Sequence, residues 1–77
     1  MQMPRILHPW EEAVGVEHGL DSEGDSLLAK IGPIVVVLPP EMEDVMRSLI
    51  GRRVGILRVD DRDRPYRLRV FEDVPRR

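Results

Sequence analysis

Hydrophobic and polar residues alternate along much of this chain, with the period of two that is typical of β-strands. The strongest run is 34–38, where three consecutive valines favour β-structure and apolar residues on both faces indicate a central strand. Residues 66–71 alternate between an apolar face and a face that carries arginine. The segments 13–20, 26–31 and 52–59 complete a set of five predicted strands.

Two polar stretches separate pairs of these strands. Residues 21–25 contain a glycine among acidic residues and predict a hairpin connection, and residues 60–65 predict a second, charged hairpin turn. Gly55 lies inside a predicted strand, where it indicates a bend or the close approach of another backbone. Residues 27–29 would suit a helix as well as a strand.

One segment, 41–50, has the period of an amphipathic helix. Its apolar stripe falls at positions i, i+3, i+4, i+7 and i+8 and consists of Met42, Val45, Met46, Leu49 and Ile50. Gly51 follows as a C-cap, and acidic residues stand near the positive end of the helix dipole. Ten residues are marginal as an isolated helix, so we expect the stripe to pack on Val35, Val37 and the strand that begins near Val54. The methionines would also suit an adaptable groove, but this stripe is the one regular apolar surface available for burial.

The order β-β-β-α-β-β predicts the α+β class: a small, antiparallel, β-rich domain with five short strands and one short helix. A partly closed barrel of the OB-like or SH3-like kind, with the helix at one end, satisfies this order. The alternative is a twisted sheet with the helix across one face. The 77 residues fit a single domain, 1–77. Within it, we expect 1–12 to form an irregular N-terminal arm and 74–77 a frayed tail.

The composition favours a soluble, cytoplasmic protein with no membrane segment. The chain has no cysteine, so it has neither a disulfide framework nor a thiolate metal site. No secretory signal pattern is visible at the N-terminus, and the longest apolar run is five residues, far too short to span a bilayer.

Nucleophiles for covalent catalysis are scarce, because threonine is absent as well as cysteine. Ser22, Ser26 and Ser48 are the serines. Either histidine could come near Ser22 or Ser26 in space, but no elbow motif supports a triad. Phosphate-binding and dinucleotide-binding glycine motifs are also missing. The sequence therefore predicts no catalytic residue, no cofactor and a protein that is not an enzyme.

The two histidines, His8 and His18, have carboxylates near them that could complete a zinc or manganese site. Their spacing of ten matches no usual ligand pattern, and we interpret His18 as filling a partly buried strand position and His8 as part of the arm. The acidic stretch 21–25 resembles a calcium loop only superficially, since it lacks the twelve-residue spacing of ligands and the flanking helices. We therefore predict no metal site.

Charge is distributed unevenly along the chain, although the formal net charge is only −2. Residues 1–50 carry three basic and nine acidic side chains, a balance of −6, and residues 51–77 carry nine arginines and five acidic side chains, a balance of +4. The candidate binding residues lie in this second part, on the predicted C-terminal hairpin: Arg58, Arg62, Arg64, Arg67, Arg69 and Phe71.

Three interpretations of the arginine-rich hairpin remain open. The first is a non-catalytic binding or assembly module that acts through a protein–protein interface with a partner or with a second copy of the chain, because opposite charges on different surfaces steer association. The second is a small nucleic-acid-binding barrel. Two observations disfavour it: the net charge is slightly acidic, and the whole chain has three aromatic residues, too few for a stacking platform. The third is a solvated strand face whose arginines are neutralised by neighbouring acids.

Overall fold

The computed structural model describes residues 3–71, and within them six strands and one short helix form an α+β domain. The elements are β1 (Pro4–Arg5), β2 (Glu12–Glu23), β3 (Ser26–Ile31), β4 (Ile34–Leu38), the 3-10 helix η1 (Pro40–Met42), α1 (Glu43–Ser48), β5 (Arg53–Arg58) and β6 (Tyr66–Phe71). The strand-rich class with one short helix is confirmed. The predicted frayed tail, 74–77, lies outside the described residues.

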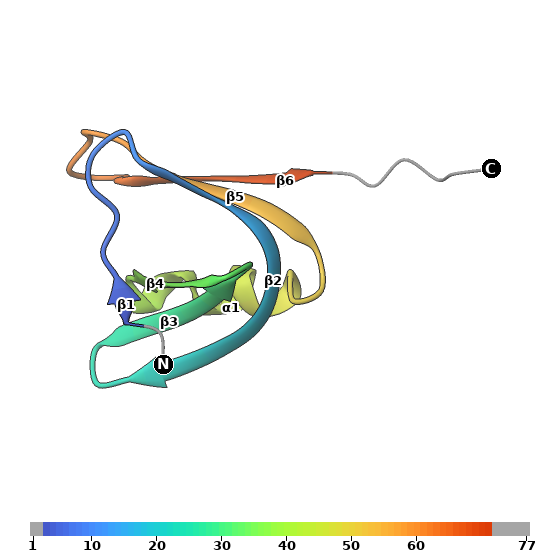
Figure 1. Ribbon diagram of the computed structural model, residues 1–77. Coiled ribbons are helices and arrows are strands. Elements are labelled where there is room, and N and C mark those ends of the chain that lie inside the picture. The colour runs from blue at the N-terminus through green and yellow to red at the C-terminus, as the bar shows by residue number, and fades with distance from the viewer. Residues whose placement is uncertain (1–2, 72–77) are drawn as a thin grey trace.

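All six strands belong to one sheet, in the order β1-β4-β3-β2-β5-β6. The long strand β2 curves from the β3 half of the sheet to the β5 half, so the two halves face each other (Figure 1). Neighbouring strands are antiparallel except β1 and β4, which are parallel, so the sheet is mixed and the expectation of a purely antiparallel one is wrong. Within residues 3–71, β6 pairs only with β5, so the sheet is open rather than closed into a barrel.

A β-bulge in β2 changes which side chains face the core. Glu17 lies opposite Ile31 and Gly19 lies opposite Lys30, so His18 is an extra residue in the strand. Its Nε2 lies 2.9 Å from the carbonyl oxygen of Gly32, and its side chain is exposed rather than partly buried as the sequence suggested. The extra residue reverses the alternation of the strand. Val14 and Val16 are consequently exposed, whereas Leu20, which an unbroken period of two would place on the same face, packs against the core.

The core lies between the two halves of the curved sheet. Its buried apolar residues are Leu7, Ala13, Leu27, Ala29, Ile31, Val36, Leu38, Met46, Leu49, Val54 and Ile56. On β4 the buried side chains are Val36 and Leu38, and the expectation that Val35 and Val37 form the core face is wrong. The reason is that both faces of this strand are apolar, so its sequence pattern does not distinguish them.

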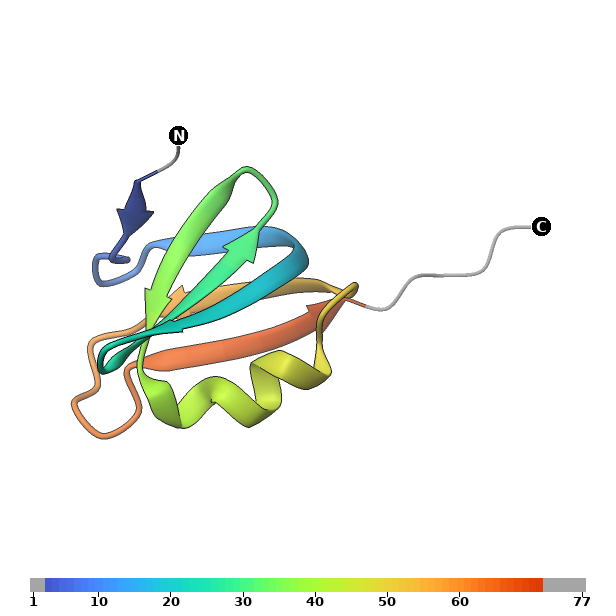
Figure 2. The ribbon, with the colours of Figure 1, turned by 90° about the horizontal axis from the view of Figure 1, so that it is seen from below.

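The helix is shorter than predicted and buries a narrower stripe. Met46 and Leu49 are buried, but Val45 is 42% and Ile50 is 46% exposed, so these two do not belong to the core. Met42, in η1, also packs against the core, so the stripe contacts the sheet along the line Met42, Met46 and Leu49. In Figure 2 the axis of α1 runs roughly parallel to β6, and Figure 1 shows that the helix lies apart from β6, at the level of β3 and β4.

The N-terminal arm connects the two edges of the core. Its residues Pro4–Arg5 form β1 against β4, and Leu7 is 1% exposed within the core. Farther along, the Trp10 amide donates a hydrogen bond to the Arg58 carbonyl of β5. The arm therefore crosses from the β4 side of the sheet to the β5 side. None of the helices in residues 3–71 is long and apolar enough to cross a membrane.

Candidate binding site

The six hairpin residues expected to bind a partner occupy three different environments on β5, β6 and the loop between them. Arg58 points into the molecule, Arg67, Arg69 and Phe71 stand on the outer face of the sheet, and Arg62 and Arg64 belong to the loop. The hairpin is therefore not one arginine stripe. Each environment has its own chemistry.

Arg58 is directed toward the N-terminal arm. Its Nη1 donates to the Leu7 carbonyl oxygen at 3.0 Å and lies 3.4 Å from the Tyr66 hydroxyl, and its guanidinium lies 5.4 Å from the centre of the Tyr66 ring. These contacts fasten the arm to the start of the β5–β6 hairpin. Arg58 therefore joins the arm to the hairpin, and its contribution to binding a partner stays a prediction.

Arg69 is part of a cluster on the outer face. Its guanidinium lies 5.2 Å from the centre of the Phe71 ring, and its Nη2 is 3.5 Å from the Glu12 carboxylate, which belongs to β2 on the other side of β5. The pair spans β5 above Gly55, where a Cβ would lie 2.9 Å from that carboxylate and 3.1 Å from the Phe71 ring. The close approach expected at Gly55 is thus made by side chains, not by another backbone.

Arg67 and Asp61 order the β5–β6 loop. The Asp61 carboxylate accepts hydrogen bonds from the backbone amides of Asp63 and Arg64 and pairs with Arg67 at 3.5 Å. The two backbone amides, with a smaller contribution from Arg67, hold the pKa of Asp61 below its usual value. The Arg67 guanidinium also donates to the Arg64 carbonyl oxygen at 2.7 Å. The loop is therefore folded on itself rather than extended.

A hollow of about 510 Å³ lies at the end of the molecule where this loop meets three other segments. Its apolar lining comes from the arm, the end of β4, η1 and the start of β6: Ile6, Val37, Leu38, Pro39, Met42, Pro65 and Tyr66. Its charged lining comes from the β2–β3 turn, η1 and the β5–β6 loop: Asp25, Glu41, Arg62, Asp63 and Arg64. None of these five charged side chains forms an ion pair within the described part of the chain.

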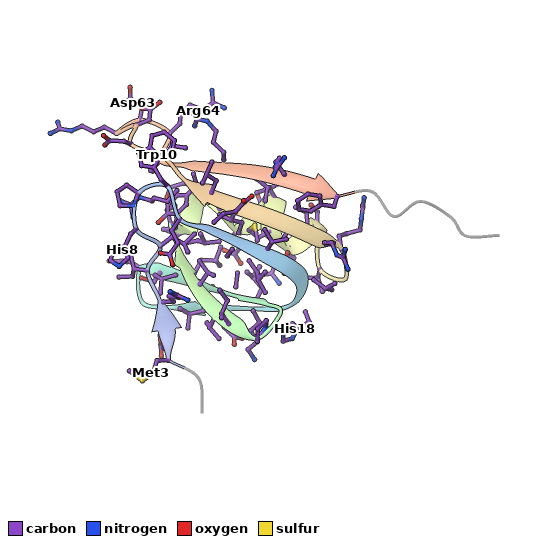
Figure 3. All side chains as sticks on the ribbon, turned by 45° about the horizontal axis from the view of Figure 1, so that its top comes forward. Met3, His8, Trp10, His18, Asp63 and Arg64 are labelled. Atoms are coloured by element: carbon purple, nitrogen blue, oxygen red, sulfur yellow. The ribbon has the colours of Figure 1, made fainter. Side chains whose placement is uncertain are left out.

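Trp10 stands at the same end of the molecule as Asp63 and Arg64 (Figure 3). Its side chain is 68% exposed, and its backbone has φ = 71°, in the left-handed region that a tryptophan rarely adopts. The carboxylate of the next residue, Glu11, accepts a hydrogen bond from the His8 amide at 2.9 Å and forms an ion pair with Arg5 at 2.9 Å. The His8 amide and, to a smaller extent, Arg5 keep the pKa of Glu11 below its usual value. The hydrogen bond and the ion pair thus order the arm into a turn that exposes the Trp10 side chain to solvent.

Sequence reasoning did not find Ile6, Trp10 or the hollow itself. The prolines of the arm predict an irregular segment and give no sign of its long-range contacts. An isolated tryptophan among charged residues is the one available signal, because a folded domain seldom leaves its single tryptophan outside the core.

His8 and His18 lie on opposite sides of the molecule (Figure 3). The carboxylate next to His18 belongs to Glu17, which points into the core while His18 points outward. Within residues 3–71 the structure brings together no group of three or more His, Cys, Asp or Glu side chains that could hold a metal ion.

Glu17 is the one buried charged residue within the described part of the chain. Its side chain is 0% exposed, and neither carboxylate oxygen has a hydrogen-bond partner. Loss of solvation raises the pKa of Glu17 to about 7. It lies away from the hollow, so it bears on stability rather than on binding.

Comparisons with protein-family models, with curated proteins and with solved structures find no match for this chain. Any function must therefore be argued from the residues of the site.

Proposed function

We propose that the protein is a non-catalytic binding module whose hollow holds an apolar side chain of a partner polypeptide. The observation that carries the proposal is the composition of the hollow, an apolar floor surrounded by unpaired charges of both signs. Protein–protein interfaces have this anatomy, with an apolar centre and a polar rim. The exposed Trp10 and the rim residue Arg64, which lies at the same end of the molecule (Figure 3), are of the residue types that dominate binding energy at such interfaces.

The topology supports a binding role for this end of the molecule. We propose that the open sheet is an OB-like barrel left unclosed, because a long first strand of the barrel, β2, is shared by two halves and a helix lies between β4 and β5. In that fold, ligands contact the loops that correspond here to the β2–β3 turn and the β5–β6 loop. Both of these segments line the hollow. Fold alone does not identify the ligand.

The charges of the rim favour a polypeptide over a nucleic acid. Two arginines face three acidic side chains there, so the hollow is not a cationic groove along which a phosphate backbone could run. Arg67 and Arg69 are paired with Asp61 and Glu12, and Arg58 is turned inward, which leaves few arginines for phosphates. Single-stranded nucleic acid remains the alternative ligand that an experiment should test.

The test is a peptide selection on the purified protein, followed by titration of the selected peptides with Trp10 fluorescence as the readout. We expect the peptides to share an apolar anchor residue, and Val37→Glu in the floor to reduce their affinity at least tenfold. Arg64→Glu at the rim should reduce it less. Arg52→Glu is the matched control, because Arg52 is also exposed and unpaired within the described residues but does not line the hollow.

Two results would overturn the proposal. One is that selected peptides bind Val37→Glu and wild-type protein equally well. The other is tight binding of single-stranded DNA whose log affinity falls with log salt at about −0.7 per phosphate neutralised. Sedimentation with and without salt, run beside the titrations, identifies a second copy as the occupant if the hollow is covered by self-association.

A further inference from the structure

The edge of the sheet at β6 is a second surface that can accept a polypeptide. The strand is six residues long, and its backbone pairs with β5 on one side only. No backbone hydrogen bond joins β6 to any other segment within residues 3–71. A strand with an unpaired row of amides and carbonyls is a template for another extended chain, unless its side chains oppose the pairing.

The side chains of β6 divide between two faces. Tyr66 and Leu68 point inward and pack against the core, and Val70, on the same face, is 39% exposed. Arg67 and Arg69 point outward and stand two residues apart. An added strand would therefore meet positive charge on its outer side and an apolar surface on its inner side.

A second copy of β6 does not suit this edge. Residues that lie directly opposite each other in an antiparallel pair share a face, so a two-fold pair centred on Leu68 places Arg67 opposite the Arg69 of the other copy. A pair centred on Arg69 places the two Arg69 side chains opposite each other. Like charges in these positions oppose pairing. The other edge, β1, has two residues, of which Pro4 has no amide to donate and Arg5 is again positive.

We propose that β6 accepts an extended segment of a different polypeptide in which acidic and apolar side chains alternate. Its acidic side chains lie opposite Arg67 and Arg69, and its apolar side chains continue the inner face beyond Val70. The ion pairs that these arginines make with Asp61 and Glu12 are exposed and 3.5 Å long, so exchanging them for acids of the partner loses little. This inference is independent of the hollow and of its ligand.

The experiment uses three synthetic seven-residue peptides with capped ends. One alternates valine and glutamate, the second alternates valine and lysine, and the third is the glutamate peptide with alternate backbone amides N-methylated. Hydrogen exchange of the β6 amides, resolved by NMR, is the readout. At ten times its Kd, the glutamate peptide should slow exchange at the edge-facing amides about tenfold. The lysine peptide and the N-methylated peptide should not.

Charge reversal gives the matched variants. Arg67→Glu with Arg69→Glu should bind the lysine peptide in place of the glutamate peptide. Arg52→Glu with Arg53→Glu changes the net charge equally but leaves the edge strand intact, so it should keep the preference for glutamate. If the first double variant fails to fold, the comparison of the three peptides on wild-type protein still decides.

Equal protection by the glutamate and lysine peptides, or none by either at millimolar concentration, would overturn the inference. So would edge amides that are already protected in the absence of peptide in a sample that sediments as a dimer, because a second copy would then occupy the edge. Val37→Glu, which alters only the hollow, should leave the β6 protection unchanged and thereby separates this inference from the proposed function.

Discussion

The backbone of Glu17 is tied to Gly51, whose amide donates to the Glu17 carbonyl oxygen at 2.6 Å, while the Glu17 carboxylate has no partner. The Glu17 amide in turn donates to the Arg52 carbonyl oxygen at 2.9 Å. These two bonds join the bulged part of β2 to the turn between α1 and β5. They fix the side chain in the core, where only its protonated form is well accommodated.

Glu17 should therefore make the protein less stable as the pH rises. Its folded-state pKa, about 7, is above the usual value of 4.5, so the native state binds a proton that the unfolded state releases between these two values. The free energy of unfolding should be highest near pH 4.5 and should fall by about 3 kcal/mol as the pH rises past 7. Urea unfolding at a series of pH values measures this change.

The isosteric variant Glu17→Gln should remove this slope, whereas Glu23→Gln, at an exposed position, should keep it. Glu11 and Asp61 have lowered pKa values, so the stability that they contribute is lost only at more acidic pH and does not interfere. A stability that is flat or rises between pH 5 and 8 in the wild-type protein would contradict the burial of this carboxylate.

The helical segment contacts the core along a narrow line, so truncating Leu49 and truncating Val45, one turn apart, should change the free energy of unfolding by very different amounts. Leu49→Ala should lower the free energy of unfolding by about 2–4 kcal/mol, because the lost burial adds to the cavity left in the core. Val45→Ala, at a position that is 42% exposed, should change it by less than about 1 kcal/mol. Chemical denaturation of the two variants checks this. Equal losses would show that the whole stripe is buried.

Gly55 should tolerate no side chain while Phe71 is present. A Cβ at this position would lie 3.1 Å from the Phe71 ring and 2.9 Å from the Glu12 carboxylate, so Gly55→Ala should be destabilising by about 1–3 kcal/mol. In a Phe71→Leu background the same change should be milder, and a double-mutant cycle measures the coupling. If the effects of Gly55→Ala and Phe71→Leu are additive, the added methyl group clashes with a residue other than Phe71.

Local alternation predicts β3, β4 and β6 at their observed bounds, because the pattern of side chains along a strand depends on neighbouring residues alone. The same alternation indicates that Arg58 points inward, because it stands two and four residues after the buried Ile56 and Val54. The rarity of buried arginine argues against that orientation, so the pattern alone does not decide it.

Long-range features could not be predicted in this way. The strand β1 consists of two residues and exists only because β4 lies beside it, and the bulge at His18 depends on the register with β3. The hollow requires four separate segments to meet, and no local pattern reports such a meeting. The class of fold thus followed from the sequence, but the candidate site required the tertiary structure.

Trp10 should contribute to binding and not to stability. Its backbone is in the left-handed region, which is unfavourable for a residue with a Cβ by roughly 1–2 kcal/mol, and its side chain is largely exposed. Trp10→Gly relieves the backbone strain but adds conformational freedom to the unfolded chain, so the free energy of unfolding should change by less than about 1 kcal/mol. The same variant should bind the selected peptides at least tenfold more weakly, measured by calorimetry since the fluorophore is gone.

Trp10→Ala should bind as weakly and be less stable than Trp10→Gly, because alanine keeps the strained backbone. A Trp10→Gly protein that unfolds more easily, yet binds as wild type, would show that the tryptophan is part of the fold and not of the site.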